Sequence, residues 1–375
     1  MIHAEVAAAS TENSTATGPG ASPAILVEGH KLHHHLDRVV PFLRGERIYP
    51  LYVEFSPVGS CNHRCTFCAY DYIGYPDRRL DTARTREVLA EMGRLGVKST
   101  LWAGEGEPLL HPEIGELAQA ARQSGMDVGM FSNASALNER KALGLLPHLT
   151  FLRVSFNAGT PETYAATHRA PAKHFALVLQ NIERAVALRA QRGWSVTLGM
   201  QIVLLPDNLA TLPELARIAQ GLGVDYLAVK PFVQHPDQEG LHWPESFSPD
   251  AIEAVAQVAE SFQNERFKVL VRRESFRNYQ RRSYRHCHAL PFFAFVLSDG
   301  NVYTCGPYYG HADHVYGNIN TQSFREIWQS ERAAAIQCHA ATKLDAQKCM
   351  PNCRPDAANR FLWELKNPPA HVNFI

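Results

Sequence analysis

The chain has 375 residues, of which 45% are apolar and 20% are charged, as is ordinary for a globular protein of about two domains. Lysine plus arginine equals aspartate plus glutamate at 37 each, so no broad field of one sign attracts nucleic acid or an anionic membrane. No stretch approaches the roughly 20 apolar residues that span a bilayer. Residues 1–25 are rich in Ala, Ser, Thr and Gly and predict a disordered segment without a secretory signal, so we expect a cytoplasmic location.

The central part of the sequence alternates between β-rich runs and amphipathic helices. Six β-rich runs are predicted, at 51–57, 97–104, 126–133, 149–157, 195–205 and 224–232. The stretches between them have helical periodicity; Phe175, Val178 and Ile182, for example, share one helical face. Successive β–α units predict a parallel sheet flanked by helices, with ligands bound at the carboxyl ends of the strands.

The first group of cysteines follows the first predicted strand. Residues 61–68 read CNHRCTFC and hold Cys61, Cys65 and Cys68. In a reducing cytoplasm such a group indicates metal binding rather than disulfides. Structural zinc usually has four closed ligands, whereas an iron–sulfur cluster on three thiolates leaves one iron open for a substrate or cofactor. The spacing favours the iron–sulfur cluster over zinc and predicts that His63, between two of the ligands, faces outward.

Polar side chains lie at the ends of the other predicted strands. In chain order they are Glu105 and Glu107 in the sequence GEGEP, Ser132 and Asn133, Ser155 and Asn157, Gln201 within the fifth run, and Lys230 at the end of the sixth. Each alone is ordinary turn or cap chemistry. Because the carboxyl ends of parallel strands meet at one edge, together they predict a polar site around the cysteine loop.

The cysteine loop, with an aromatic residue before its last cysteine, resembles the signature of the radical S-adenosylmethionine (SAM) superfamily. GEGEP resembles the Gly-Gly-Glu-Pro motif of that family. The resemblance covers roughly 50–265 and implies a partial (β/α)6 TIM-like barrel. It also implies that Cys61, Cys65 and Cys68 bind a [4Fe–4S] cluster, whose open iron takes the amine and carboxylate of SAM.

The same resemblance implies which side chains contact SAM. The amine would be accepted by Glu107, which precedes the proline, with Glu105 as the competing carboxylate. The other implied cofactor-binding residues are Ser155 and Asn157 near the ribose or carboxylate, Phe67 and Tyr70 near the adenine, and Ser132, Asn133 and Gln201 at neighbouring strand ends. Cleavage of SAM would give a 5′-deoxyadenosyl radical, which abstracts a hydrogen atom in an enclosed site.

The C-terminal part of the sequence holds the remaining cysteines. Residues 287–305 predict a β-hairpin around the turn SDG, with Cys287 and Cys305 at its two ends. A helix is predicted over 323–337, and Cys338, Cys349 and Cys353 come after it.

This cysteine spacing resembles the SPASM/twitch subgroup of the superfamily. The number of cysteines matches the shorter twitch type, which has one extra [4Fe–4S] cluster, and implies Cys287, Cys305, Cys349 and Cys353 as its ligands. Cys338 would be left over, either to replace Cys349 or to donate a hydrogen atom to a substrate radical. A zinc site or separate core thiols are the alternatives.

We expect four segments in the chain: 1–25 disordered, 26–48 an N-terminal extension, 49–270 the partial barrel, and 271–375 the auxiliary-cluster domain. The residues before the first strand leave no room for the peptide-binding domain of relatives that modify peptides. A small polar substrate, such as a sugar or aminocyclitol, is therefore the expected substrate class.

The expected reaction is oxidation of an alcohol by a radical SAM oxidoreductase. The alternatives are a sugar epimerase with a cysteine hydrogen donor, a peptide-modifying enzyme, and a non-enzymatic iron–sulfur electron carrier. A flavodoxin- or ferredoxin-type reductant is the expected partner, with no role for nucleic acid or a membrane. Within a basic segment at 271–286, Arg272, Arg273 or Arg285 would bind phosphate or carboxylate, unless the segment is a solvated linker helix.

Overall fold

The computed structural model describes residues 29–235, 248–279 and 281–374. Its strands form one ten-stranded sheet in the order β10-β9-β8-β1-β2-β3-β4-β5-β6-β7. Strands β1 to β7 run parallel, β8 pairs in parallel with β1, and β9 is antiparallel to both β8 and β10. The strands are β1 (Tyr52–Phe55), β2 (Ser99–Trp102), β3 (Asp127–Ser132), β4 (Phe151–Ser155), β5 (Thr197–Leu204), β6 (Tyr226–Pro231), β7 (Lys268–Val271), β8 (Phe293–Val296), β9 (Asn301–Tyr303) and β10 (Val315–Asn318).

The six predicted β-rich runs correspond to β1 through β6, so this part of the prediction is confirmed. The prediction omitted β7, whose four residues read KVLV and pair in parallel with β6. A strand this short, beginning with an exposed lysine, gives little periodic signal. The partial barrel therefore continues one parallel strand beyond the predicted set.

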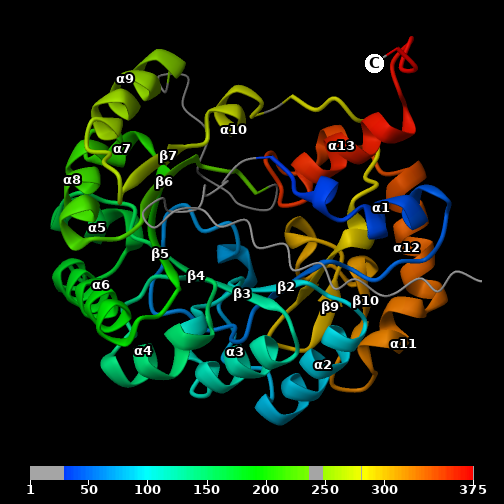
Figure 1. Cartoon of the computed structure of the whole chain (residues 1–375), viewed down its shortest axis with the longest axis horizontal. Helices are drawn as coiled ribbons and strands as arrows, with labels where there is room; N and C mark the ends of the chain where they lie inside the picture. Colours follow the sequence, from blue (N-terminus) through cyan, green and yellow to red (C-terminus); the bar gives the residue numbers. More distant parts are fainter. Residues whose placement is uncertain (1–28, 236–247, 280, 375) are drawn as a thin grey trace, which may run out of the picture.

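Helices cover one side of this curved sheet. Figure 1 shows α2, α3, α4, α6, α8 and α9 in an arc outside the strands, which is the arrangement of a partial β/α barrel. The helices are α1 (Leu36–Leu43), α2 (Thr82–Arg94), α3 (Ile114–Gln123), α4 (Glu139–Leu145), α5 (Pro161–His168), α6 (Lys173–Arg192), α7 (Pro206–Leu209), α8 (Leu212–Leu222), α9 (Pro249–Glu260), α10 (Arg273–Arg277), α11 (Phe324–Gln329), α12 (Glu331–Thr342) and α13 (Asp356–Lys366). The predicted apolar face of α6 is buried.

The two faces of the sheet differ in chemistry. Along β4, Leu152 and Val154 are buried in the large apolar core that the helices cover. The alternate residues Arg153 and Ser155 are partly exposed and belong to the opposite, inner face. The helix-covered face therefore supplies the core, and the inner face is left for polar side chains.

The C-terminal part is built onto the same sheet rather than onto a separate one. The predicted hairpin forms β8 and β9, and Tyr52 of β1 lies opposite Phe293 of β8. The single helix predicted over 323–337 is wrong, because the structure has two helices, α11 and α12. Ser330 has extended backbone between them, and its hydroxyl caps α12 by accepting from the Ala333 amide at 3.0 Å.

The described part of the N-terminal extension packs against the C-terminal helix. Leu32, Val39 and Ile48 form a small apolar cluster with Phe292 and with Leu362 of α13. Figure 1 shows α1 beside α13. The predicted disordered segment, 1–25, lies outside the described residues.

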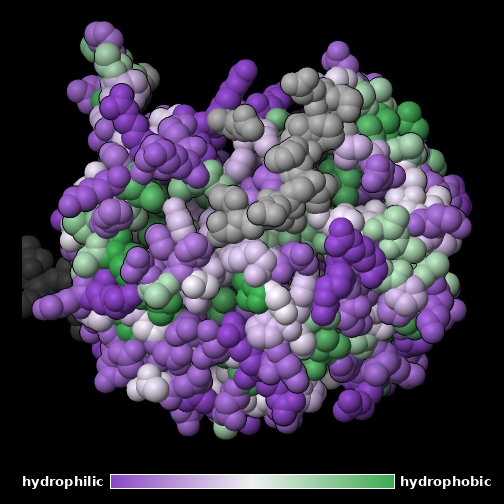
Figure 2. All heavy atoms as spheres, turned by 180° about the vertical axis from the view of Figure 1, so that it is seen from behind, coloured by the Kyte–Doolittle hydropathy of each residue, from purple (hydrophilic) through white to green (hydrophobic). Residues whose placement is uncertain are grey.

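On the face shown in Figure 2, hydrophilic side chains predominate and hydrophobic ones lie in scattered groups. None of the helices in the described ranges combines the length and the apolar composition needed to cross a bilayer.

Candidate functional site

The first cysteine group lies in the loop that leaves β1. Cys61, Cys65 and Cys68 form no disulfide and are half-buried. The backbone of this loop is attached to the end of α5, where the Arg64 amide donates to the His168 carbonyl at 3.0 Å. The Cys65 sulfur also lies 3.1 Å from Nδ1 of the buried His168 ring. The loop and its thiols are therefore fixed against the body of the barrel.

The environment of these thiols opposes a negative charge unless a positive group balances it. Burial raises the pKa of Cys61 to about 12, and the Glu107 carboxylate adds to the effect. Burial also raises the pKa of Cys65, as do the neighbouring sulfurs of Cys68 and Cys61. Metal coordination deprotonates a thiol outright, so a cluster bound here would replace the missing positive charge.

His63 is buried, and the prediction that it faces outward is wrong. Only 1% of the residue is exposed. Its Nε2 lies 3.1 Å from the Tyr164 hydroxyl, and the Asn133 side-chain amide lies 2.9 Å from its Nδ1. Burial, and then the nearby His168 and His174 rings, lower the pKa of His63 to about 3, so the ring is neutral near pH 7. The residue between two of the cysteines thus anchors the loop.

Glu107, in the GEGEP sequence, is buried beside this loop. It accepts hydrogen bonds from the Ser132 hydroxyl at 2.6 Å, the Asn133 amide at 2.7 Å and the Leu109 amide at 3.0 Å. Burial raises the pKa of its carboxyl group, and these donors oppose the shift. Ser132 and Asn133, which the resemblance gave as cofactor-binding residues, hold Glu107 and the cysteine loop in place.

The second carboxylate of the motif, Glu105, has a different role from that of Glu107. Its carboxylate accepts from the backbone amide of Ser298 at 2.9 Å and from the hydroxyl of the same residue. It also forms a 3.2 Å ion pair with Arg78. These bonds tie the loop after β2 to the β8–β9 turn, so of the two competing carboxylates it is Glu107 that lies among donors next to the thiols.

The two glycines of GEGEP are required by close backbone approach. Gly104 has a φ of +101°, and a Cβ there would lie 1.7 Å from the Ser56 hydroxyl oxygen. A Cβ on Gly106 would lie 2.4 Å from the Val58 carbonyl oxygen and 2.5 Å from that of Ser60. The motif therefore packs backbone against backbone on the start of the cysteine loop, which explains why small residues separate the two glutamates.

Replacing Glu105 with glutamine should destabilise the fold. The change removes the charge from a buried carboxylate that accepts two bonds from Ser298 and pairs with Arg78. We expect the free energy of unfolding to fall by about 1–3 kcal/mol in chemical denaturation. The matched change Glu214→Gln, in an exposed pair with Arg217, should alter it by less than about 0.5 kcal/mol. Equal effects of the two variants would contradict this role.

Ser155 ends β4 and is followed closely by Asn157, and Gln201 lies within β5 opposite Ser155. Gln201 is buried and donates weakly to Ser155 at 3.4 Å, while its side-chain oxygen has no partner among the described residues. Asn157 is fully buried, accepts from the Val203 amide at 2.8 Å and lies 3.5 Å from the His168 ring. Gln201 thus offers a free acceptor, whereas Asn157 holds the strand ends together.

The two aromatic residues of the cysteine loop point to different places. Phe67 packs on Val203 and Phe232, at the ends of β5 and β6. Tyr70 stacks on Tyr309, with ring centroids 4.9 Å apart. The latter contact joins the cysteine loop to the segment that follows Cys305, so Tyr70 links the two halves of the molecule.

The second cysteine group surrounds a cavity. Cys287, Cys305, Cys349 and Cys353 line a space of about 440 Å³. Burial raises the pKa of Cys287 to about 11 and also raises that of Cys305 and Cys353, with the neighbouring sulfurs contributing. Cys338 lies exposed on α12 and is absent from the lining. The structure therefore brings together the four predicted ligands and leaves Cys338 outside.

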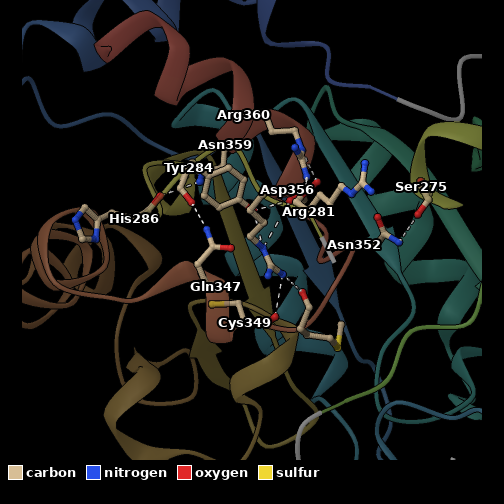
Figure 3. A network of polar contacts seen from close by, with 12 residues as sticks. Ser275, Arg281, Tyr284, His286, Gln347, Cys349, Asn352, Asp356, Asn359 and Arg360 are labelled. Carbon is tan, nitrogen blue, oxygen red and sulfur yellow. Dashed lines mark hydrogen bonds and ion pairs between the residues drawn. The ribbon is translucent and has the colours of Figure 1, made fainter. Parts of the chain in front are cut away.

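A polar network holds the loop that carries Cys349 and Cys353 (Figure 3). The Arg282 guanidinium donates to the carbonyls of Cys349 at 2.9 Å and Met350 at 2.6 Å. Asp356 accepts from the Tyr284 hydroxyl at 2.5 Å and pairs with Arg360 at 2.9 Å. These bonds attach the loop to residues 281–288, the segment that carries Cys287.

Both cysteine groups fit iron–sulfur clusters. Their donors are soft thiols, and at the second group four of them face one cavity that is large enough for more than a single ion. Within the described ranges, no three His, Cys, Asp or Glu side chains meet the geometry of a site for one metal ion.

Sequence reasoning missed a pair that joins the two halves. Arg354, directly after Cys353, forms a 2.9 Å ion pair with the buried Glu54 of β1. Glu54 also accepts from the Tyr52 hydroxyl at 2.9 Å. A glutamate inside an otherwise apolar strand was the available signal for this inner-face site. His168 had no such signal, because it lies far from Cys65 in the sequence.

Comparison with known proteins agrees with these two groups. The radical SAM superfamily model matches residues 55–219, and an iron–sulfur cluster-binding domain model, SPASM, matches residues 287–355. The sequence is 27% identical to GTP 3′,8-cyclase of Chlorobaculum tepidum over 49% of this chain and 55% of that protein. It is 29% identical to dTDP-4-amino-4,6-dideoxy-D-glucose ammonia-lyase of Streptomyces venezuelae over 50% of this chain and 41% of that protein. The chain thus spans about half the length of these relatives.

The fold is similar to that of solved structures. Streptococcus suis SuiB bound to its precursor peptide SuiA superposes with a TM-score of 0.62 and 14% identity, over 82% of this chain and 71% of that one. The structure of anSMEcpe with bound AdoMet superposes with a TM-score of 0.56 and 16% identity, over 76% of this chain and 83% of that one. With both cysteine groups inside the matched ranges, the chain carries a radical SAM domain over residues 55–219 and a SPASM-type iron–sulfur cluster-binding domain over residues 287–355.

Proposed function

We propose that this radical SAM enzyme oxidises an alcohol group of a small polar substrate of the sugar or aminocyclitol type. The observation that carries the proposal is the contact between the second cysteine group and the inner face of the sheet. Cys353 is followed directly by Arg354, whose guanidinium pairs with Glu54 on that face. Alcohol oxidation removes one hydrogen atom, one proton and one further electron. An electron acceptor at these thiols would lie within one residue of the surface on which the substrate would be bound.

The cofactors of the family are a [4Fe–4S] cluster with SAM in the barrel and auxiliary iron–sulfur chemistry in the SPASM domain. We assign the first cluster to Cys61, Cys65 and Cys68, and a single auxiliary [4Fe–4S] cluster to Cys287, Cys305, Cys349 and Cys353. When bound, these groups supply the hydrogen-abstracting radical and the acceptor for the last electron.

The residues of the chain would position SAM and substrate around this chemistry. Glu107 accepts three hydrogen bonds, and a carboxylate has about four acceptor sites, so one is left for the SAM amine. The unpaired oxygen of Gln201 is an acceptor for a hydroxyl of the ribose or of the substrate. Phe67, packed on apolar residues at the ends of β5 and β6, would help to exclude water.

Epimerisation of a sugar, the first alternative, needs a hydrogen donor in the site. Cys338 is the one cysteine of the chain outside the two assigned groups, and it is exposed on α12. That placement supports oxidation over epimerisation.

Modification of a peptide is the second candidate function. SuiB was solved with its precursor peptide, and PqqA peptide cyclase of Gluconobacter oxydans is 26% identical over 45% of this chain. The sugar-nucleotide ammonia-lyase of Streptomyces venezuelae, matched over 50% of this chain, supports a sugar instead. We favour the small molecule, with a flavodoxin- or ferredoxin-type protein as the reductant.

Product analysis tests the proposal. The protein, reconstituted anaerobically with iron and sulfide, is incubated with SAM, dithionite and panels of sugars, aminocyclitols and short peptides. We expect 5′-deoxyadenosine in amounts equal to those of an oxidised small-molecule product. Mass spectrometry should show that this product has lost two hydrogen atoms.

Other results would replace the proposal with a named alternative. A product whose mass is unchanged in H2O and one unit higher in D2O would identify an epimerase. Turnover of peptides alone would identify a peptide-modifying enzyme. Redox cycling with no 5′-deoxyadenosine would identify an electron carrier.

A further inference from the structure

The inner face of the sheet gathers cationic side chains from separate elements. Arg153 comes from β4, Lys230 from β6, and Arg354 from the loop after the last cysteine. Together with Arg272, which follows β7, Arg153 and Arg354 act electrostatically on Lys230, and Glu54 opposes them. The ammonium group of Lys230 makes no hydrogen bond or ion pair with any described residue. One carboxylate therefore faces several cations.

Aromatic rings hold two of these cations in place. The Arg153 guanidinium lies 4.9 Å from the centroid of the Phe131 ring, and its Nε donates to the Tyr226 hydroxyl at 2.9 Å. The Arg354 guanidinium lies 5.5 Å from the same Phe131 ring and 5.8 Å from the Tyr52 ring. Guanidinium groups stacked on aromatic rings lose little further entropy when they bind a ligand.

This arrangement of like charges is electrostatically unfavourable when no anion is bound. Burial, and then the like charges of Arg272, Arg354 and Arg153, lower the pKa of Lys230 to about 7, because both disfavour the ammonium form. Solvent nevertheless reaches Arg354, since 38% of its side chain is exposed, although its partner Glu54 is only 3% exposed. An anion that entered this space would relieve the repulsion and meet donors that are already positioned.

We propose that Arg153, Lys230 and Arg354 form a subsite for an anionic group of the substrate, either a phosphate or a carboxylate. The inference rests on the proposed function for the presence of a small polar substrate, and it narrows that substrate to an acidic one. Two of the three residues come from barrel strands, and the third comes from the cysteine loop of the auxiliary domain. The subsite would therefore place the substrate between the two cysteine groups.

Sulfate is a suitable probe for this subsite, because it is a tetrahedral dianion that does not titrate near neutral pH. Its binding to the reconstituted protein is measured by calorimetry in the presence of saturating SAM, with dimethyl sulfone as the neutral control of similar shape. We expect sulfate to bind and dimethyl sulfone not to bind. The variants Arg153→Gln and Lys230→Met should each weaken sulfate binding about tenfold or more. Arg122→Gln, in an exposed pair with Asp127, should leave it unchanged.

The pH dependence gives a readout that a general loss of structure would not reproduce. With its pKa near 7, Lys230 is mostly charged at pH 6 and mostly neutral at pH 8, so the free protein must take up a proton to bind sulfate at pH 8. Affinity should fall about tenfold between these pH values in the wild type and stay level in Lys230→Met. The pKa of the neighbouring Tyr52 is well above this range.

Three results would overturn the subsite: no sulfate binding by the wild type, equal binding by the Arg153 and Lys230 variants, or loss of sulfate binding when SAM is added. The last would mean that the cations bind the carboxylate of SAM. Subsequent titration with acetate and inorganic phosphate separates a carboxylate from a phosphate preference. Failure here would leave the production of 5′-deoxyadenosine intact, whereas failure of the proposed function would show in that assay and not in sulfate binding.

Discussion

Replacing Cys65 with alanine should abolish the formation of 5′-deoxyadenosine from SAM and remove about half of the iron, from about eight atoms per chain to about four. Cys65 is one of three thiols on the loop after β1, and its sulfur lies against His168. With two thiolates left, a four-iron cluster would expose a second iron and lose its anchor. Iron analysis and chromatography of the nucleoside products check the two parts of this result.

The control for this variant is Cys338→Ala, which removes the exposed thiol of α12. It should leave both the iron content and the nucleoside yield unchanged. Wild-type amounts of 5′-deoxyadenosine from the Cys65 variant would show that this loop does not hold the cluster that cleaves SAM. A Cys338 variant that loses iron would make that thiol a ligand in place of Cys349.

The Cys305→Ala variant should separate cleavage of SAM from oxidation of substrate. Cys305 lines the C-terminal cavity and lies outside the cysteine loop of the barrel. We expect the variant to keep about four irons and to form 5′-deoxyadenosine. Its yield of oxidised product should fall about a hundredfold or more relative to the wild type, because the last electron has no acceptor. Comparing the two product yields in one reaction checks this.

A Cys305 variant that still converts substrate with the wild-type ratio of products would contradict the role of the auxiliary group in oxidation. The comparison is informative only if the barrel is intact. The parallel variant Cys353→Ala, which removes another thiol of the same cavity, should therefore give the same pattern.

Most of the barrel could be predicted from the sequence because its signals are local. The strands β1 to β6 appear as apolar runs, and the face of α6 appears as 3.6-residue periodicity. The break at Ser330 was missed because a serine cap inside an amphipathic pattern resembles a polar position on a continuous helix. The pairing of β8 with β1 could not be predicted either, because the sequences of two strands so far apart in the chain do not indicate how they align.

The same difference between local signals and long-range packing applies to the candidate site. The cysteine groups and Glu107 have spacing that can be read directly, and the structure brings each predicted set of thiols together. The exclusion of Cys338 from the cavity, the burial of His63 and the pairing of Arg354 with Glu54 depend on how distant segments pack. Asn157 shows the limit most clearly, since a position at a strand end does not determine whether a side chain faces a ligand or the core.

The central claim is that Cys61, Cys65 and Cys68 hold a [4Fe–4S] cluster with one open iron that binds SAM. Electron paramagnetic resonance of the reduced, anaerobically reconstituted protein, recorded with and without SAM, tests this claim most directly. We predict that SAM changes the g-values of one of two cluster signals and that the Cys65→Ala variant lacks the responsive signal. Zinc at these three thiols, or a spectrum that SAM leaves unchanged, would contradict the account.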